Sequence, residues 1–274
     1  MLSKEILGEP EDVLAKSAVK MWGENVEIVD LTHPFSGMTP TWPYGAENIQ
    51  IIRLRAHAKD RVLCQKICHT MHMATHIDAP LHVEEGYPSI DEVPLDRYIG
   101  EGVIVSIPKE DWEVITPEDL EKVEPSIEKG DIVIINSGWH RYFGDCIKYF
   151  CYAPGLYREA AQWFVKKGVK GVGVDQPAID HPLGTRLAQG SGYTPLAPWL
   201  VEEYKRKTGR NVDEDFPYWE PAHRILYTHG IFGCENVGGD IDKVTGKRCL
   251  LIGFPLKWVG GDASMVRLVA VAKK

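Results

Sequence analysis

The stretch His72-Met73-Ala74-Thr75-His76-Ile77-Asp78-Ala79-Pro80-Leu81-His82 holds three imidazoles and one carboxylate within eleven residues. These four side chains stand at even positions, so an extended strand would project His72, His76 and Asp78 to one face. A helix would point His76 and Asp78 roughly 200° apart, and Pro80 favours extended geometry in the residue before it. Imidazole nitrogens beside an anionic oxygen suit a divalent cation. The stretch therefore predicts a strand that carries a metal site, and hydrolysis is the chemistry such a site serves.

The alternative is a surface strand with several solvated histidines. Four of the ten histidines in the chain lie between His69 and His82, which chance clustering explains poorly. Cys64 and Cys68 lie just before the cluster and could be further ligands. Free cysteine is among the most buried residue types, so we expect these two to be buried strand residues.

The composition indicates a soluble globular protein with a sizeable core. The chain has 274 residues, of which 44% are hydrophobic and 26% charged, and its net charge is −8. This charge disfavours nucleic acid and anionic membranes as partners, and no apolar run reaches the 18 residues that suggest a membrane span. The N-terminal residues do not resemble a signal peptide. Six cysteines without a CxxC pair fit a reduced, cytoplasmic protein.

Hydrophobic patterning predicts more strands than helices, interleaved irregularly. Strands are expected at 26–31, 48–56, 61–72, 102–108, 131–136, 169–175, 231–235, 248–254 and 266–272, and helices at 10–21, 157–167, 198–207 and 222–230, with a further helix that starts at 116–119. This order predicts an α/β (α+β) fold, a single domain with a mixed β-sheet, a barrel-like β/β/α core and flanking helices. Residues 1–25 would form a helical extension before a domain at 26–274.

Residues 72–82 resemble the hallmark of the metal-dependent cyclase family, which includes bacterial kynurenine formamidase and isatin hydrolase. Ala74 is the one softer match, because glycine is commoner there. Further family blocks follow in order: Asp30-Leu31-Thr32, residues 39–43, Ser137-Gly138-Trp139, Gly173-Val174-Asp175, residues 222–226, residues 234–237, Phe254-Pro255-Leu256 and residues 262–267. The resemblance covers residues 26–272. It implies a cyclase-like, metal-dependent hydrolase domain that acts on a small-molecule amide.

The resemblance also implies roles for individual residues. The metal ligands would be His72, His76, Asp78, His223 and Glu235. His82 would be the general acid/base, which agrees with an imidazole pKa near neutrality. The metal would be Zn²⁺ or Mn²⁺, one or two per chain, and it would lower the pKa of its water towards roughly 7.

Glu235 bears on the number of metal ions. Isatin-type relatives are thought to use one manganese and have an amide side chain at this position, so the carboxylate favours two. Glu235 also ends an apolar strand, where an unpaired carboxylate would be costly and a metal would offset that cost. A homodimer or higher homo-oligomer is a further expectation from the family.

Trp42 lies in a loop that resembles the one carrying the substrate-contacting tryptophan of formamidases. It could stack on an aromatic substrate or simply pack in the core, since the chain has eight tryptophans. Asp175, at a predicted strand end, is expected to cap a turn rather than reach the pocket. Residues 180–220 appear as a longer segment than in formamidases and are expected to be an insertion or a lid.

The predicted reaction is hydrolysis of an N-formyl aryl amine, a lactam or an imide. Two alternatives stay open at this point. One is a metal-dependent lyase or cyclase that activates a carbonyl without attack by water. The other is a non-catalytic metal- or ligand-binding protein.

Overall fold

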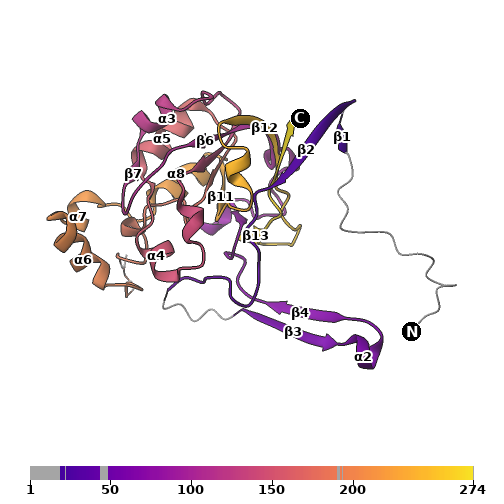
Figure 1. Ribbon diagram of the computed structural model, residues 1–274. Coiled ribbons are helices and arrows are strands. Elements are labelled where there is room, and N and C mark those ends of the chain that lie inside the picture. The colour runs from indigo at the N-terminus through magenta and orange to yellow at the C-terminus, as the bar shows by residue number, and fades with distance from the viewer. Residues whose placement is uncertain (1–18, 22, 44–48, 190–191, 193, 274) are drawn as a thin grey trace.

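The computed structural model describes residues 19–21, 23–43, 49–189, 192 and 194–273 (Figure 1). A ten-stranded mixed sheet forms its centre. In spatial order the strands are β1 (Val19–Met21), β2 (Glu24–Asp30), β14 (Val269–Lys273), β12 (Lys247–Ile252), β6 (Ile99–Ser106), β8 (Ile132–Asn136), β10 (Gly171–Val174), β11 (Phe232–Glu235), β5 (His76–Asp78) and β13 (Ala263–Met265). The four strands β6, β8, β10 and β11 run parallel to their neighbours in this group, and the other pairings are antiparallel.

The sheet curls so that its distant strands meet. An isolated bridge pairs Thr32, just after β2, with Val237, just after β11, and the Gly238 N–H donates to the Leu31 carbonyl at 2.9 Å. Strands β2 and β11 are separated by five strands in the sheet order, so this contact closes one end of the curl. The mixed sheet with a barrel-like centre confirms the predicted fold class.

Apolar cores lie on both faces of the sheet because residues 132–135 of the central strand β8 are all apolar. All five residues of β8 are buried; Val133 and Ile135 pack into one cluster, whereas Ile132 and Ile134 pack into the other. This alternation is typical of a strand covered on both faces. Helices α3 (Pro117–Lys122), α5 (Arg158–Lys167) and α8 (Pro221–Thr228) contribute to the first cluster.

A third apolar cluster lies beside the sheet and includes residues from the predicted insertion at 180–220. It gathers Trp112, Tyr149, Leu183, Tyr204 and Phe216, all buried. The elements here are two short paired strands, helices and 3₁₀ turns: β7 (Val114–Ile115), β9 (Gly155–Leu156), α4 (Cys146–Cys151), α6 (Trp199–Thr208), α7 (Val212–Asp215), η3 (Trp139–Tyr142) and η4 (Pro182–Gly184). The described part of the segment 180–220 is therefore held by apolar contacts with residues outside it, such as Trp112 and Tyr149.

A β-hairpin projects away from the rest of the molecule (Figure 1). It consists of β3 (Gln50–Arg55), α2 (His57–Asp60) and β4 (Cys64–Cys68), and every residue of both strands is exposed. The prediction that Cys64 and Cys68 are buried is wrong, since both are exposed and no other described segment covers this hairpin. The remaining short elements are η1 (Pro80–His82), η2 (Leu95–Arg97) and η5 (Ile241–Lys243).

Two further predictions need correction. The helix expected over residues 10–21 is not found at its C-terminal end, where Val19–Met21 forms β1 and pairs with β2; residues before 19 lie outside the described ranges. The strand expected over 61–72 ends at Cys68, and a run of bends separates it from β5. Ala74 causes part of this break, because its φ of 49° lies in the left-handed region that no strand residue adopts.

No helix in the described ranges is both long enough and apolar enough to cross a membrane.

Candidate metal centre

The site is built on β5, which lies between β11 and β13. The antiparallel register places His76 beside Glu235 of β11, with His76 Nε2 3.3 Å from Glu235 Oε2 and 3.3 Å from Asp78 Oδ1. The other ring nitrogen, Nδ1, lies 2.9 Å from the Ala74 carbonyl. A hydrogen bond there requires a proton on Nδ1, so the neutral ring presents a bare Nε2 to the carboxylates.

His223 reaches the same carboxylates from the first turn of α8. Its Nε2 lies 2.9 Å from Glu235 Oε1 and 3.8 Å from Asp78 Oδ2. Its Nδ1 contacts Asp180 Oδ2 at 2.6 Å, and the carboxylate of Asp180 also accepts the backbone N–H groups of Ala222 and His223. The same carboxylate of Asp180 therefore caps α8 and orients the imidazole ring of His223.

His72 comes from the bends before β5 and not from the strand itself. Its Nδ1 lies 2.9 Å from Asp78 Oδ1, and its Nε2 lies 3.0 Å from Asp262 Oδ2. The single extended strand predicted for His72, His76 and Asp78 is thus wrong at His72, although the three side chains do converge. The left-handed Ala74 turns the chain between them, and glycine would adopt this backbone conformation more easily.

Two groups of side chains have ligand atoms within 4.8 Å of one another: His72, Asp78 and His82, and His76, Asp78 and Glu235. Asp78 belongs to both. His76 Nε2 and Asp78 Oδ1 are buried and have no hydrogen-bond partner among the described residues, because the polar atoms 2.9 and 3.3 Å away do not have hydrogen-bond geometry. Unpartnered buried polar atoms are costly. A cation between them would remove that cost, so the donor set fits a divalent metal.

Electrostatics couples the imidazoles to the carboxylates. Burial alone would lower the pKa of His72 and His76, but the charge of Asp78 outweighs it and raises these pKa values to about 9 and about 10. The pKa of His223 is likewise raised well above its ordinary value, chiefly by Glu235 against burial. Burial and Asp78 oppose ionisation of Glu235, yet His223 and His76 hold its pKa at about 2. Without metal, protons on the imidazoles balance the carboxylate charge at neutral pH.

His82 lies at the rim of the site, at the end of η1 and two residues after Pro80. Its ring centroid is 4.1 Å from that of His72 and 6.1 Å from that of His223. One side of the residue is exposed to solvent, whereas the ring is desolvated on its inner side. This desolvation, together with the nearby His72 and His223, lowers the pKa of His82 to about 4. The imidazole is therefore neutral at pH 7 and able to accept a proton.

Trp42 is partly buried, and its ring lies 5.0 Å from that of Phe150, at the edge of the third apolar cluster. This packing matches the core alternative for Trp42. Contact with a substrate stays a prediction.

Three residues that support the site were not identified as such from the sequence. Asp180 and Asp262 contact His223 and His72, and the Tyr227 hydroxyl donates to Asp78 Oδ2 at 3.0 Å. Asp180 is 43 residues from His223, so only the tertiary structure pairs them. Tyr227 stands four residues after His223 on one helix face, which is the single local signal that could have indicated it.

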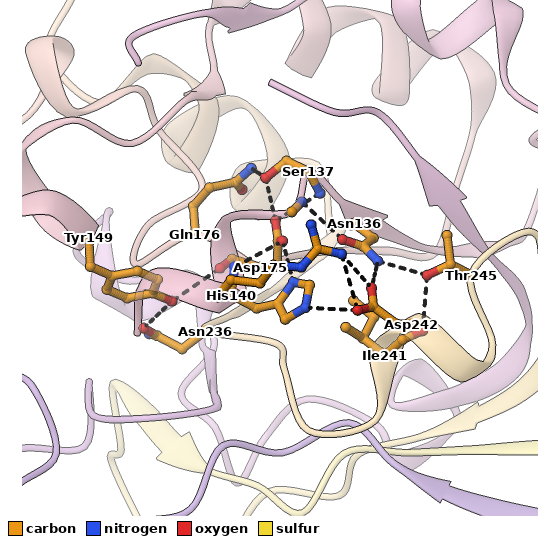
Figure 2. Close-up of polar contacts among 12 residues, drawn as sticks. Asn136, Ser137, His140, Tyr149, Asp175, Gln176, Asn236, Ile241, Asp242 and Thr245 are labelled. Atoms are coloured by element: carbon orange, nitrogen blue, oxygen red, sulfur yellow. Dashed lines mark hydrogen bonds and ion pairs between the residues drawn. The ribbon is translucent and has the colours of Figure 1, made fainter. Parts of the chain in front are cut away.

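A second polar cluster surrounds Asp175 (Figure 2). The Asp175 carboxylate accepts the Ser137 N–H and hydroxyl at 3.0 and 2.6 Å, and the His140 N–H and Nδ1 at 3.2 and 3.0 Å. Gln176 donates to the Ser137 hydroxyl. These contacts confirm that Asp175 caps a turn.

Comparisons with known proteins agree with this arrangement. The kynurenine formamidase of Bacillus cytotoxicus is 25% identical over 243 residues, which cover 89% of this chain and 96% of that protein. The kynurenine formamidase of Bacillus anthracis is 24% identical over 242 residues, 88% and 95% of the two chains.

Solved structures show the same fold. Isatin hydrolase A from Ralstonia solanacearum superposes with a TM-score of 0.72 at 20% identity, over 90% of this chain and 92% of that one. Isatin hydrolase A from Labrenzia aggregata, bound to benzyl benzoate, gives a TM-score of 0.70 at 23% identity, over 91% and 94%. The model of the Cyclase family, described as "Putative cyclase", matches residues 29–181, more than half of the chain. The chain therefore belongs to the Cyclase family.

Proposed function

We propose that this protein is a metal-dependent amidohydrolase that cleaves the C–N bond of a small linear or cyclic amide. One observation carries the proposal: His76 Nε2 and Asp78 Oδ1 are buried, converge on one point and lack hydrogen-bond partners. The names of the relatives, kynurenine formamidase and isatin hydrolase, support amide hydrolysis as the reaction.

The metal would be held by His72, His76, Asp78, His223 and Glu235. Zn²⁺ and Mn²⁺ both accept this mixture of imidazole and carboxylate ligands. Two ions are favoured over one, since Asp78 belongs to both ligand groups and has two oxygens to share between them. When bound, the metal supplies Lewis acidity and activates water for attack on a carbonyl.

The residues around the metal would bind, orient and move protons. Asp180 and Asp262 hold the rings of His223 and His72 in position. Neutral His82 at the rim would take a proton from the attacking water and pass it to the leaving nitrogen. As the new C–O bond forms, the C–N bond breaks, the nitrogen gains the proton that His82 carried, and the acyl carbon becomes a carboxylate; in a lactam or imide both groups stay in one ring-opened molecule.

The substrate class follows from the relatives and from the chain. An N-formyl aryl amine, a lactam or an imide is the preferred candidate, and Trp42 would contact its aromatic ring. The segment 180–220 would serve as an insertion that shapes the pocket. All six cysteines are free, which supports a reducing, cytoplasmic setting.

The first test is metal content with activity, on protein purified without chelator. We expect close to two metal ions per wild-type chain, and fewer in Glu235→Gln. The metal-loaded enzyme should hydrolyse a member of an amide panel of formanilides, lactams and imides, and mass spectrometry should show that the products together contain one water more than the substrate. Products whose summed mass equals that of the substrate would indicate a lyase or cyclase instead. Failure to bind Zn²⁺ or Mn²⁺ at all would overturn the proposal.

A further inference from the structure

Glu220 stands immediately before α8, three residues ahead of His223, and its backbone is left-handed, with φ 44° and ψ 50°. A residue with a side chain adopts this conformation less easily than glycine. Hydrogen bonds hold the backbone here: the Glu220 N–H donates to the Gly184 carbonyl at 2.8 Å, and the Tyr218 N–H donates to the Tyr157 hydroxyl at 2.7 Å. Backbone strain of this kind is concentrated at functional sites. Since glycine would relieve the strain, we expect the side chain of Glu220 to have a function that offsets it.

The Glu220 side chain does not stabilise the helix that it precedes. It makes no capping hydrogen bond to α8, because the carboxylate of Asp180 caps this helix instead. Arg224, one turn further along α8, has other partners: its guanidinium donates to the Val83 carbonyl at 3.0 Å and lies 3.4 Å from the carboxylate of Glu84. The Glu220 carboxylate therefore has neither a hydrogen bond nor an ion pair with any residue in the described ranges.

A second polar group without a partner directly precedes Glu220 in the chain. The indole Nε1 of Trp219 is buried and has no hydrogen-bond partner among the residues that the structure describes. The Arg224 guanidinium lies over the indole ring, 5.2 Å from its centroid. A buried N–H donor and a desolvated carboxylate are both costly when they lack partners. A bound molecule with one cationic donor and one acceptor would satisfy the two groups together.

The carboxyl group of Glu220 lies close enough to the metal centre to interact with its charges. Burial raises the pKa of Glu220 to about 7, with further contributions from Asp180 and Glu235, whereas His223 and Arg224 oppose the rise. Three of these four charged side chains are proposed metal ligands or orient one. Glu220 itself belongs to neither of the two groups whose ligand atoms lie within 4.8 Å of one another. We therefore place its carboxylate beside the ligands rather than among them.

The charge of the centre favours a cationic partner for this carboxylate. When all are ionised, the carboxylates at the centre exceed the charge of two divalent cations by one unit, and that of one divalent cation by three: Asp78, Asp180, Glu220, Glu235 and Asp262. Imidazole ligands are neutral when they bind a metal and leave this balance unchanged. An anionic substituent would be repelled, whereas an ammonium group would be attracted and would stabilise the ionised form of Glu220.

We propose that Glu220 is a specificity-determining residue: its carboxylate binds a protonated amine of the substrate, while the Trp219 indole N–H donates to an acceptor on the same molecule. This inference rests on the proposed hydrolysis of amides at the metal centre. It narrows the substrate class from small amides in general to amides that carry an ammonium group.

The first experiment compares matched substrates on metal-loaded protein. Formanilides with an aminomethyl group at the ortho, meta or para ring position carry a positive charge at neutral pH, and the ethyl formanilides have nearly the same shape without it. For wild type, kcat/KM of at least one aminomethyl isomer should exceed that of its ethyl counterpart at least about tenfold, as a charge-assisted hydrogen bond allows. Glu220→Gln should reduce this ratio to about one and keep the wild-type metal content. The matched control, Glu118→Gln, removes an exposed carboxylate from the first turn of α3 and should keep the ratio.

Glu220→Gly separates the carboxylate from its strained backbone. Glycine relieves the left-handed conformation, so this variant should unfold at the same urea concentration as wild type or at a higher one. It should lose the preference for the cationic substrate as fully as Glu220→Gln does. A less stable Glu220→Gly would show that the side chain supports the fold, and loss of metal from Glu220→Gln would make Glu220 a ligand. Either result would overturn the proposal.

Ligand-observed NMR provides a readout that does not need catalysis. Saturation transfer should show that wild type binds benzylamine more tightly than benzyl alcohol, and that Glu220→Gln has no such preference. If no formanilide is cleaved but this preference is present, amide hydrolysis is wrong and cation binding at Glu220 stands. If the ethyl formanilides are cleaved and none of the three aminomethyl isomers is preferred, cation recognition is wrong and hydrolysis stands. Equal binding of the two probes to wild type would contradict cation recognition as well.

Discussion

The metal centre and the Asp175 cluster contain the same kinds of side chain but differ in how their polar atoms are satisfied. In the Asp175 cluster, four donors from Ser137 and His140 occupy both carboxylate oxygens (Figure 2). In the metal centre, Asp78 Oδ1 and His76 Nε2 have no hydrogen-bond partner among the described residues. A buried Asp beside a His is therefore not enough to indicate a binding site, whereas buried polar atoms that converge without partners do indicate one.

The largest expected effect separates these two aspartates directly. Asp78→Asn should abolish metal binding and reduce hydrolysis to background, because the shared anionic ligand is lost. Asp175→Asn should keep its metal but unfold more easily, by about 1–3 kcal/mol, because an amide NH₂ cannot accept the surrounding donors. Elemental analysis measures the metal content of the two variants, and urea unfolding measures their stability. Equal loss of metal in Asp78→Asn and Asp175→Asn would contradict the proposed difference between the two clusters.

His82 provides the next test, because it could be either a proton carrier or a ligand. For a proton carrier, His82→Gln should keep the wild-type metal content and lower kcat by about 10²–10⁴-fold. The measurement is steady-state kinetics on metal-loaded protein, with elemental analysis of the same sample. Loss of metal together with activity would assign His82 to the ligand group that includes His72 and Asp78.

Asp180 should have a smaller effect, since it acts through His223. Asp180→Asn weakens the contact with His223 Nδ1 and the cap of α8. We expect a loss of about 10–100-fold in metal affinity, as is usual for residues that orient a ligand. Competition with a chromogenic chelator measures this affinity. Asp180→Glu, which keeps the carboxylate, serves as the comparison, and an unchanged affinity in Asp180→Asn would exclude a positioning role.

The smallest expected effect is on the pH dependence of the free energy of unfolding, which should differ between metal-free and metal-loaded protein. The pKa values of His72 and His76 are raised to about 9 and about 10 in the metal-free fold. Raised values stabilise the fold fully below the ordinary pKa near 6.5, and this contribution is lost as the pH rises through 9 and 10.

The free energy of unfolding of chelated protein should therefore decline between pH 6.5 and 9.5. Metal-loaded protein should decline less, because its imidazoles are already neutral ligands. Urea unfolding at the two pH values measures the decline in the free energy of unfolding. Asp78→Asn is the control, because it removes the charge that raises the pKa values of His72 and His76. Equal slopes for the chelated and the loaded protein would contradict the assignment.

Local sequence patterns predicted most of the fold. The apolar run at 131–136 corresponds to β8, and the amphipathic stretch at 157–167 corresponds to α5, with Gly168 left-handed after it. Thr116 and Asp119 form a capping box at the start of α3. These features depend on neighbours within a few residues, so the sequence is sufficient to indicate them. The extent of β4 and the position of His72 were predicted wrongly, because a backbone turn at Ala74 interrupts the extended strand on which the predicted alternation of side chains depends.

The residues available for the chemistry can be identified from the sequence, since imidazoles and carboxylates at short spacing indicate a metal site. How they meet depends on the tertiary structure. The antiparallel register brings Glu235 beside His76, across 159 positions of sequence. The cap of α8 brings Asp180 to His223, and the exposure of every residue of β3 and β4 is likewise visible only in the structure. These contacts are non-local, and a local pattern carries no information about which distant segment will satisfy a buried charge.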